Sequence, residues 1–173
     1  TRAEIVGKSI EDKINHAYAF GGTDMAIETI ENFLNIPIDY FVKVNMDGFK
    51  EAVDAIGGVK VQNDLAFTNG PFSFNKGVLE LDGQKALAYS RMRKDDPNND
   101  FGRQERQKAL IKAMIDKGAS LSTITRFDDI FHVLGRNVKT NLTFNEMLEI
   151  QNLYKDAGKH IEQLQIKGKD QYI

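Results

Sequence analysis

The chain has 173 residues, of which 41% are hydrophobic and 28% are charged. This composition is that of an ordinary globular protein long enough to bury a core, so we expect one domain over residues 1–173. The net charge of −2 disfavours a nucleic-acid-binding regulator, because such domains are usually basic. The lack of cysteine excludes disulfides, thiol nucleophiles and zinc held by cysteine.

Helical and strand patterns alternate along the chain. In chain order we expect a helix over residues 23–35, a strand over 38–45, a helix over 47–56, a strand over 59–62, a loop or hairpin with exposed aromatic side chains over 63–77, helices over 81–93, 101–117, 122–134 and 143–155, and a strand over 160–168. Glycine pairs at 21–22 and 57–58 mark turns, and Thr143 with Glu146 forms a capping box. This alternation of helices and strands indicates a layered α/β domain.

The helix expected over 101–117 carries arginines on an unusual face. On a helical wheel Leu110 and Met114 fall within about 20° of Arg103, Gln107 lies about 40° away, and Arg106 lies on the flank about 60° away. We therefore expect Arg103 and Gln107 to face inward at the N-terminal end of this helix. Inward arginines need a partner. The partner is either a protein carboxylate or a bound anion, which a helix N-terminus favours.

Two other pairs of polar residues lie two positions apart. Arg91 and Arg93 diverge on a helix but share a face on an extended segment, so a helix that ends near Tyr89 lets both reach one ligand. The alternative is a basic helix C-terminus that complements the helix dipole. Lys13 and Asn15 have the spacing of the polar face of a short strand, and that spacing alone indicates no further role.

The acidic residues between the arginines do not form a calcium loop. Asp96, Asn98 and Asp100 match the first positions of an EF-hand, but its sixth position requires glycine and is Phe101, and its twelfth requires glutamate and is Gln107. We therefore expect Asp100 to cap the helix or to pair with an arginine. The three histidines show no metal-ligand spacing.

Five ordered motifs carry a family resemblance. They are K-I-N-x-A-Y-x-x-G-G (13–22), I-P-I-D-Y-F-V (36–42), D-x-I-G-G-V (54–59), L-x-L-D-G-x-x-A-L-A-Y-x-R-x-R (79–93) and D-x-G-R-x-x-R-Q (100–107). With these motifs the chain resembles the LytR-CpsA-Psr family of bacterial cell-wall glycopolymer ligases. The resemblance covers most of the chain up to about residue 117 and is less distinctive beyond it.

The resemblance implies a fold and an activity. The expected fold is a three-layer α/β/α sandwich with a central mixed sheet. The expected enzyme is a phosphotransferase of cell-wall biogenesis in a Gram-positive bacterium. It moves an anionic glycopolymer, such as wall teichoic acid, from an undecaprenyl-pyrophosphate carrier to peptidoglycan, with the help of Mg²⁺. The resemblance places it at the extracellular face of the cell membrane, held by a single membrane-spanning helix.

The resemblance also assigns residue roles. It implies catalytic and pyrophosphate-binding roles for Arg91, Arg93 and Arg103, since fixed arginines stabilise the charge of a transferring phosphoryl group and their planar fork suits phosphate oxygens. Asp100 is expected to orient an arginine. The full set expected at the pyrophosphate is Lys13, Asn15, Arg91, Arg93, Arg103, Arg106 and Gln107.

The chain departs from the family pattern at its start. It opens at Thr1 without methionine, and it shows no window of about 20 apolar residues that would span a membrane. We expect the membrane helix, one or more N-terminal strands and the carboxylates that hold Mg²⁺ to lie upstream of Thr1, with no metal ligand in this chain. The 173-residue chain alone is therefore expected to be poorly active. The alternative function is a non-catalytic module that binds polyprenyl phosphates or regulates their use.

Overall fold

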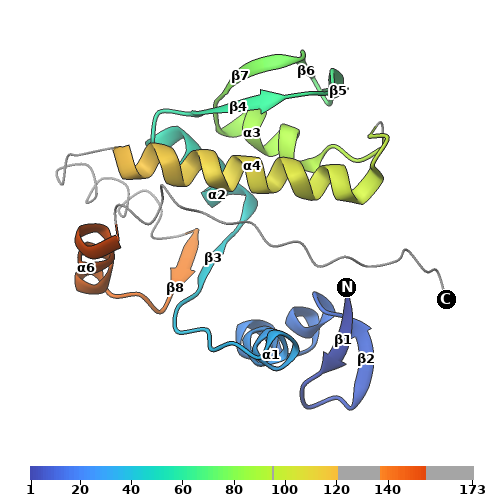
Figure 1. Cartoon of the computed structure of the whole chain (residues 1–173), viewed down its shortest axis with the longest axis vertical. Helices are drawn as coiled ribbons and strands as arrows, with labels where there is room; N and C mark the ends of the chain where they lie inside the picture. Colours follow the sequence, from blue (N-terminus) through green and yellow to red (C-terminus); the bar gives the residue numbers. More distant parts are fainter. Residues whose placement is uncertain (95, 121–136, 155–173) are drawn as a thin grey trace. The chain divides into compact units, whose positions relative to one another are not determined.

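The structure is a computed structural model that describes residues 1–94, 96–120 and 137–154. These residues belong to two compact units, of which the first comprises residues 1–41 and the second begins at Val42 (Figure 1). No helix in the described part of the chain is long and apolar enough to cross a membrane. The single-domain organisation expected from the length of the chain stays a prediction.

The first unit begins with a hairpin. Strand β1 (Arg2–Ile5) pairs antiparallel with β2 (Ile10–Lys13), and the register sets Arg2 opposite Lys13. Alternate residues of β1, Ala3 and Ile5, are buried, which is the period-two pattern of a strand with one face on a core. The hairpin therefore places Lys13 at the C-terminal end of β2, opposite Arg2 of β1.

Helix α1 (His16–Leu34) is broken at the glycine pair predicted to form a turn. Gly21 and Gly22 have non-helical dihedral angles, and Gly22 has φ 70° and ψ −151°, a conformation that favours glycine. The helix then continues to Leu34, and Asn35 ends it in the left-handed region with φ 53°. The predicted turn and the predicted helix end are therefore both confirmed.

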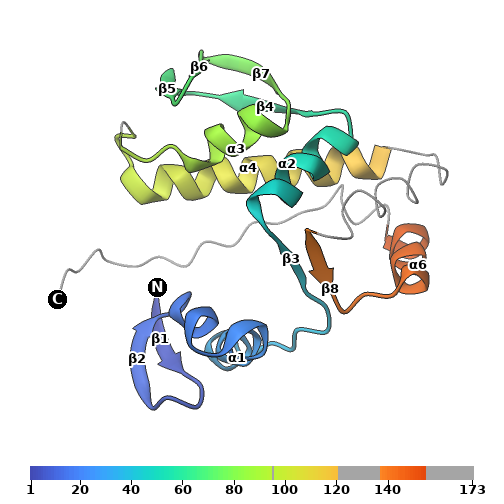
Figure 2. The ribbon, with the colours of Figure 1, turned by 180° about the vertical axis from the view of Figure 1, so that it is seen from behind.

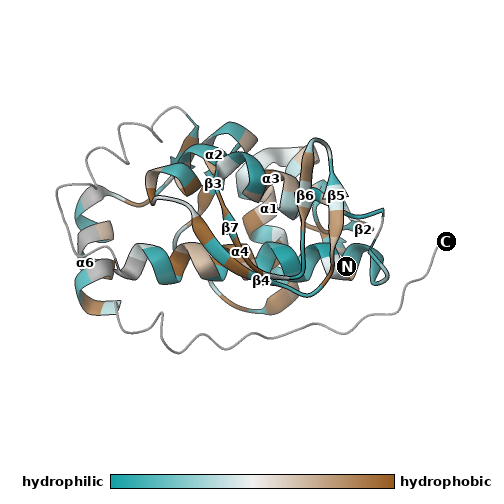
Figure 3. Ribbon diagram, turned by 90° about the horizontal axis from the view of Figure 1, so that it is seen from above, coloured by the Kyte–Doolittle hydropathy of each residue, from teal (hydrophilic) through white to brown (hydrophobic). Residues whose placement is uncertain are grey.

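The second unit is built on β4 (Val59–Asn63), which pairs antiparallel with β7 (Gly77–Leu81). Residues of β4 alternate between buried and exposed, so Val59 and Val61 face the core. Helix α4 (Asn99–Ser120) packs against β4 and against α3 (Gly83–Arg91), and hydrophilic and hydrophobic residues alternate along it (Figure 3). The predicted strand over 59–62 and the predicted helix over 101–117 are confirmed.

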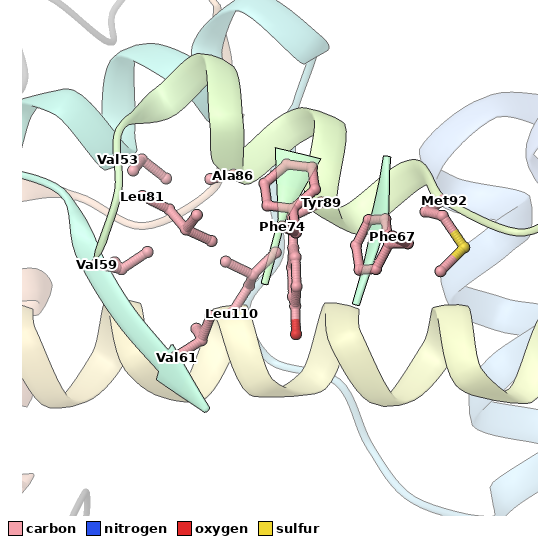
Figure 4. Close-up of a cluster of buried hydrophobic side chains, with 10 residues drawn as sticks. All are labelled: Val53, Val59, Val61, Phe67, Phe74, Leu81, Ala86, Tyr89, Met92 and Leu110. Carbon is pink, nitrogen blue, oxygen red and sulfur yellow. The ribbon is translucent and has the colours of Figure 1, made fainter. Parts of the chain in front are cut away.

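The hairpin within residues 63–77 corrects the expectation that its aromatic side chains are exposed. Strands β5 (Phe67–Asn69) and β6 (Phe72–Phe74) form it, as predicted, but its aromatic side chains are not all exposed. Phe67 is 8% and Phe74 is 2% exposed, because their rings stack on each other and on Tyr89 of α3 with centroids 4.8 to 5.6 Å apart. Figure 4 shows these rings beside Leu110 of α4, in one cluster of buried side chains.

Helix α2 (Met46–Ala55) packs against α3 at a close approach of the two backbones (Figure 2). A Cβ atom on Gly83 would overlap the carbonyl oxygen of Lys50, so only glycine fits there. The Gly83 N–H donates to Asp54 Oδ1 at 2.7 Å, and the Asp82 side chain caps α3 by accepting from the N–H of Lys85 at 2.8 Å. The D-x-I-G-G-V and L-D-G motifs thus fix the start of α3.

The remaining elements of the second unit are β3 (Val42–Val44), β8 (Val138–Thr140) and α6 (Phe144–Tyr154). β3 and β8 pair antiparallel. The strand expected over 38–45 is thus shorter, and the N–H of Ile38 donates instead to Glu31 Oε1 at 2.7 Å. The capping box is confirmed, because Thr143 N donates to Glu146 Oε2 at 2.7 Å and Glu146 N to Thr143 Oγ1 at 3.3 Å.

The α/β class is confirmed. The strands of the described residues pair in four two-stranded antiparallel sheets, β1–β2, β3–β8, β4–β7 and β5–β6. All four pairs are antiparallel, so the parallel pairs of the expected central mixed sheet are not among the strand pairs of the described residues. The helix expected over 122–134 and the strand expected over 160–168 lie outside the described residues.

Candidate functional site

The C-terminal end of α3 exposes two arginines on either side of a buried methionine. Arg91 is the last residue of α3, and Met92 continues the chain in an extended conformation with φ −60° and ψ 134°. Met92 is buried, whereas Arg91 and Arg93 on either side of it are exposed. The helix ends two residues later than near Tyr89, and Arg91 Nη1 lies 3.6 Å from the sulfur of Met46.

The first turn of α4 supplies the second group of charges. Arg103 Nη2 lies 2.7 Å from Asp100 Oδ1, and Arg93 Nε lies 3.7 Å from the same oxygen. Asp100 thus lies between an arginine of the segment after α3 and an arginine of α4. All three side chains are 36–58% exposed, so solvent or a ligand can reach them. This is the arrangement expected of an aspartate that orients arginines. We give the name arginine cluster to these two arginines together with Arg91, which lies two residues before Arg93 and contacts Met46.

Arg106 differs from the sequence prediction. It was expected on the flank of α4, but it is buried, and Gln107, expected to face inward, is exposed. Among residues 99–118 of α4 the buried positions are Gly102, Arg106 and Leu110, at a spacing of four residues. The helical wheel, centred on Arg103, therefore placed the inward face one residue too far toward the C-terminus. The error arose because glycine and arginine are not counted as apolar, so Gly102 and Arg106 did not mark the buried face. The missed signal is Gly102, a residue small enough to leave room beside Arg106.

The guanidinium group of Arg106 bonds to two parts of the preceding loop. Nη1 donates to Asp96 Oδ2, and Nη2 donates to the carbonyl oxygen of Met92. The guanidinium carbon lies 5.4 Å from the centre of the Phe67 ring, within cation–π range. Gln107 Nε2 donates to the carbonyl of Ser90 at 3.4 Å. Side chains of α4 thus satisfy carbonyl groups at the end of α3, which have no partner within that helix.

Two pKa values are shifted beside Arg106. Burial raises the pKa of Asp96, but the hydrogen bond from Arg106, the N–H of Asn98 and the charge of Arg106 together lower it below its ordinary value. Burial raises the pKa of Tyr89, and the charge of Arg106 opposes this rise only in part. Tyr89 is therefore neutral at physiological pH, and its hydroxyl donates to Asn63 Oδ1 at 3.3 Å.

Lys13 and Asn15 belong to the first unit. Lys13 ends β2, and Asn15 precedes α1, where its side chain makes no capping hydrogen bond. Beside them, His16 Nδ1 lies 2.8 Å from Asp12 Oδ2, and this hydrogen bond, with one from the N–H of Lys13, lowers the pKa of Asp12. The assignment of Lys13 and Asn15 beside the arginine cluster stays a prediction.

The carboxylates of the described residues do not fit a magnesium site. No group of three or more His, Asp or Glu side chains in the described ranges is arranged to hold a metal ion. Asp96 and Asp100 are both engaged, Asp96 by Arg106 and Asp100 by Arg103. A use of Mg²⁺, with ligands upstream of Thr1, stays a prediction.

The described residues form an α/β protein with exposed arginines at the end of α3, just after it and in the first turns of α4, and a helix N-terminus with an arginine favours anions such as phosphate. The LytR_cpsA_psr family model matches residues 1–173. The chain therefore belongs to the LytR-CpsA-Psr family.

Named relatives agree with this family. The chain is 55% identical over 168 residues to the polyisoprenyl-teichoic acid–peptidoglycan teichoic acid transferase TagU of Bacillus subtilis strain 168, a match that covers 97% of this chain and 55% of TagU. A crystal structure of B. subtilis TagV matches with a TM-score of 0.88 and 41% identity, over 99% of this chain and 69% of that one. A structure of TagT bound to LI-WTA matches with a TM-score of 0.73 and 32% identity, over 90% and 59%. The chain spans about half the length of the curated relatives it matches.

Proposed function

We propose that this chain provides the pyrophosphate-binding part of a phosphotransferase of cell-wall biogenesis. The enzyme attaches an anionic glycopolymer, such as wall teichoic acid, from an undecaprenyl-pyrophosphate carrier to peptidoglycan. The observation that carries this proposal is the arginine cluster, in which Arg93 and Arg103 approach the same oxygen of Asp100 from two elements and remain accessible. Similarity to the teichoic acid transferase TagU and to TagT, whose structure is bound to LI-WTA, supports the substrate class.

The role of the arginines in phosphoryl transfer follows from where negative charge develops during the reaction. A hydroxyl of peptidoglycan attacks the phosphorus on the sugar side of the pyrophosphate and gives up its proton to water. The bond from this phosphorus to the bridging oxygen breaks, and the lipid leaves as its monophosphate. Negative charge gathers on the phosphoryl oxygens and on the leaving oxygen. Arg91, Arg93 and Arg103 stabilise this charge, because their guanidinium groups donate two parallel hydrogen bonds to phosphate. Asp100 holds Arg103 in place until the ligand is bound.

The setting of the enzyme is part of the proposal. A lipid-linked substrate and a peptidoglycan acceptor meet at the extracellular face of the membrane, so we place the protein there, anchored by a helix upstream of Thr1. Gln107 completes the contacts of the second unit to the pyrophosphate, and Mg²⁺ ligands also lie upstream. Nucleic acid is not a partner, since the chain is slightly acidic.

The test measures binding first and turnover second. Arg91→Ala and Arg103→Ala are each expected to weaken binding of geranyl pyrophosphate by roughly tenfold or more, the effect of removing hydrogen bonds to a charged group. Lys112→Ala is the matched control, because Lys112 is an exposed cation of α4 that pairs with Asp116 instead. Unchanged affinity in both arginine variants would refute the pyrophosphate site.

Turnover separates an enzyme from a binding module. A protein that extends upstream of Thr1 is incubated with Mg²⁺, a polyprenyl-pyrophosphate-linked saccharide and peptidoglycan fragments. Release of polyprenyl monophosphate is expected. Binding without release would favour the non-catalytic module, and full activity of the 173-residue chain would contradict the expectation that upstream carboxylates are required.

A further inference from the structure

Arg106 is placed to control the spacing between the two groups that form the arginine cluster. It belongs to α4, less than one helical turn after Arg103. Through Nη2 it bonds to the backbone of Met92, the residue between Arg91 and Arg93, and through Nη1 it bonds to Asp96 further along the same loop. One guanidinium group thus ties the segment that carries Arg91 and Arg93 to the helix that carries Arg103.

We propose that Arg106 is a positioning residue for the pyrophosphate site, and that Asp96 and Gly102 are the residues that hold it in place. This inference rests on the proposed function. It assigns to Arg106 no contact with the substrate. Its role is to keep Arg91 and Arg93 at the distance from Arg103 that one pyrophosphate group can bridge.

The bonds of Asp96 show that the loop is shaped around this pair. Its Oδ1 accepts from the N–H of Asn98 at 2.7 Å, and its carbonyl accepts from the N–H of Asn99 at 2.9 Å, where α4 begins. Its Oδ2 accepts from Arg106. Asp96 therefore fixes the turn into α4 with its backbone and one oxygen, while the other oxygen holds the arginine.

Gly102 provides the space that the pair requires. A Cβ atom built on Gly102 would overlap the carboxylate of Asp96. Gly102 lies four residues before Arg106, on the same side of α4. Any larger residue at position 102 would push Asp96 away from Arg106, so this glycine is required by the pair and not by a turn.

Direct binding of the substrate by Arg106 is disfavoured by its surroundings. Both of its terminal nitrogens are used within the protein, and its side chain is 8% exposed. It borders a cleft of about 560 Å³, but none of the arginine cluster lines this cleft, and the acidic side chains of Asp64 and Glu105 do. An anion would be repelled there.

The experiment removes a negative charge at Asp96, a change for which electrostatics and positioning predict opposite effects on anion affinity. Asp96→Asn removes one negative charge beside the site, so electrostatics alone predicts tighter binding of an anion. Positioning predicts the opposite, because Arg106 loses the carboxylate that orients it. We expect the affinity for inorganic pyrophosphate and for geranyl pyrophosphate to fall by roughly tenfold to a hundredfold, the effect of a misplacement of about 1 Å. Asp116→Asn, the same charge change on the exposed side of α4, is the control and should change affinity less than about twofold.

A second variant keeps the charge balance. Arg106→Lys retains the cation, but an ammonium lacks the planar fork that reaches Asp96 and the Met92 carbonyl together. It is expected to fold, as judged by its thermal midpoint, and to bind pyrophosphate about tenfold more weakly. A purely structural role would lower the midpoint and leave the affinity of the folded protein unchanged. The double variant Asp96→Asn/Arg106→Lys should lose no more affinity than either single variant, because both break the same unit.

Two results would overturn the inference. One is a folded Asp96→Asn protein that binds pyrophosphate as tightly as the parent or more tightly. The other is a folded Arg106→Lys protein with parental affinity, which decides the matter if Asp96→Asn fails to fold. In either case loss of binding in Arg91→Ala and Arg103→Ala would leave the proposed function standing, whereas retained binding in those variants would remove the proposed function itself.

Discussion

Two arginines three residues apart on α4 have opposite surroundings. Arg103 pairs with Asp100, and both side chains are more than a third exposed; Arg106 pairs with Asp96, and both are nearly inaccessible. The partners are alike in chemistry, since each arginine binds an aspartate that precedes it. An exposed pair contributes about 0–1 kcal/mol to stability. Breaking a buried pair by removing one partner costs several kcal/mol, because the other charge is left buried and unpaired.

The difference shows how one short segment serves two purposes. The Asp100–Arg103 pair is weak enough for a phosphate group to replace the carboxylate at little cost, so Arg103 is available to a ligand. The Asp96–Arg106 pair cannot open in the same way, so Arg106 is available only to the protein. The accessible pair binds and the buried pair holds the loop in shape.

The largest effect should come from breaking the buried pair. Arg106→Ala is expected to lower the free energy of unfolding by about 3–5 kcal/mol, since Asp96 then lies buried without its partner. Arg103→Ala, the matched change at the exposed pair, should lower it by at most about 1 kcal/mol. Urea denaturation followed by circular dichroism measures both. Equal losses in the two variants would show that the two pairs do not differ.

The glycines of α4 give the next largest contrast. Gly102→Ala should destabilise the protein by about 1–3 kcal/mol, the range for overpacking, because the new methyl group meets the carboxylate of Asp96. Gly118→Ala on the same helix meets no atom within 4 Å and should stabilise it by up to about 1 kcal/mol through helix propensity. Thermal melts of the two variants check the sign of each change. A stabilising Gly102→Ala would mean that Asp96 does not need this space.

The smallest effect concerns pH. The pKa of Asp96 is lowered in the folded protein, so the folded state binds fewer protons at this carboxyl than the unfolded state does. Its contribution to stability is present above the ordinary pKa of aspartate, about 3.9, and is lost as the pH falls through the lower folded value. The difference in unfolding free energy between the parent and Asp96→Asn should therefore be constant near neutral pH and shrink below about pH 4. A difference that stays unchanged down to about pH 2 would contradict the pairing.

Much of the local structure follows from short-range signals. The capping box at Thr143 and the break at Gly21–Gly22 each depend on residues within a few positions, and both were predicted from the sequence. The end of α3 was predicted less closely, because a helix over 81–93 or one that ends near Tyr89 was expected and the helix ends at Arg91. The place of Arg91 and Arg93 beside Arg103 came from the family motifs, because the loop between them has no pattern that predicts its path.

The features that were missed depend on distant partners. Phe67 and Phe74 lie in a polar stretch, and they are buried because their rings pack against each other and against Tyr89 of α3. Arg106 is inside because Asp96, ten residues earlier, turns its carboxylate toward α4. A wheel of apolar residues cannot show this, since a buried charge is compatible with the core only once its counter-charge is known.

The position of Tyr89 has a practical consequence for spectroscopy. The chain contains no tryptophan and five tyrosines, so tyrosine dominates its near-ultraviolet absorption. Among the tyrosines of the described residues, Tyr89 is 2% exposed, whereas Tyr18, Tyr40 and Tyr154 are 44–62% exposed. Its ring lies against Phe67, which also lies under Arg106. Near-ultraviolet circular dichroism, which responds to tyrosines in fixed asymmetric surroundings, therefore follows the region around Arg106 without any added label.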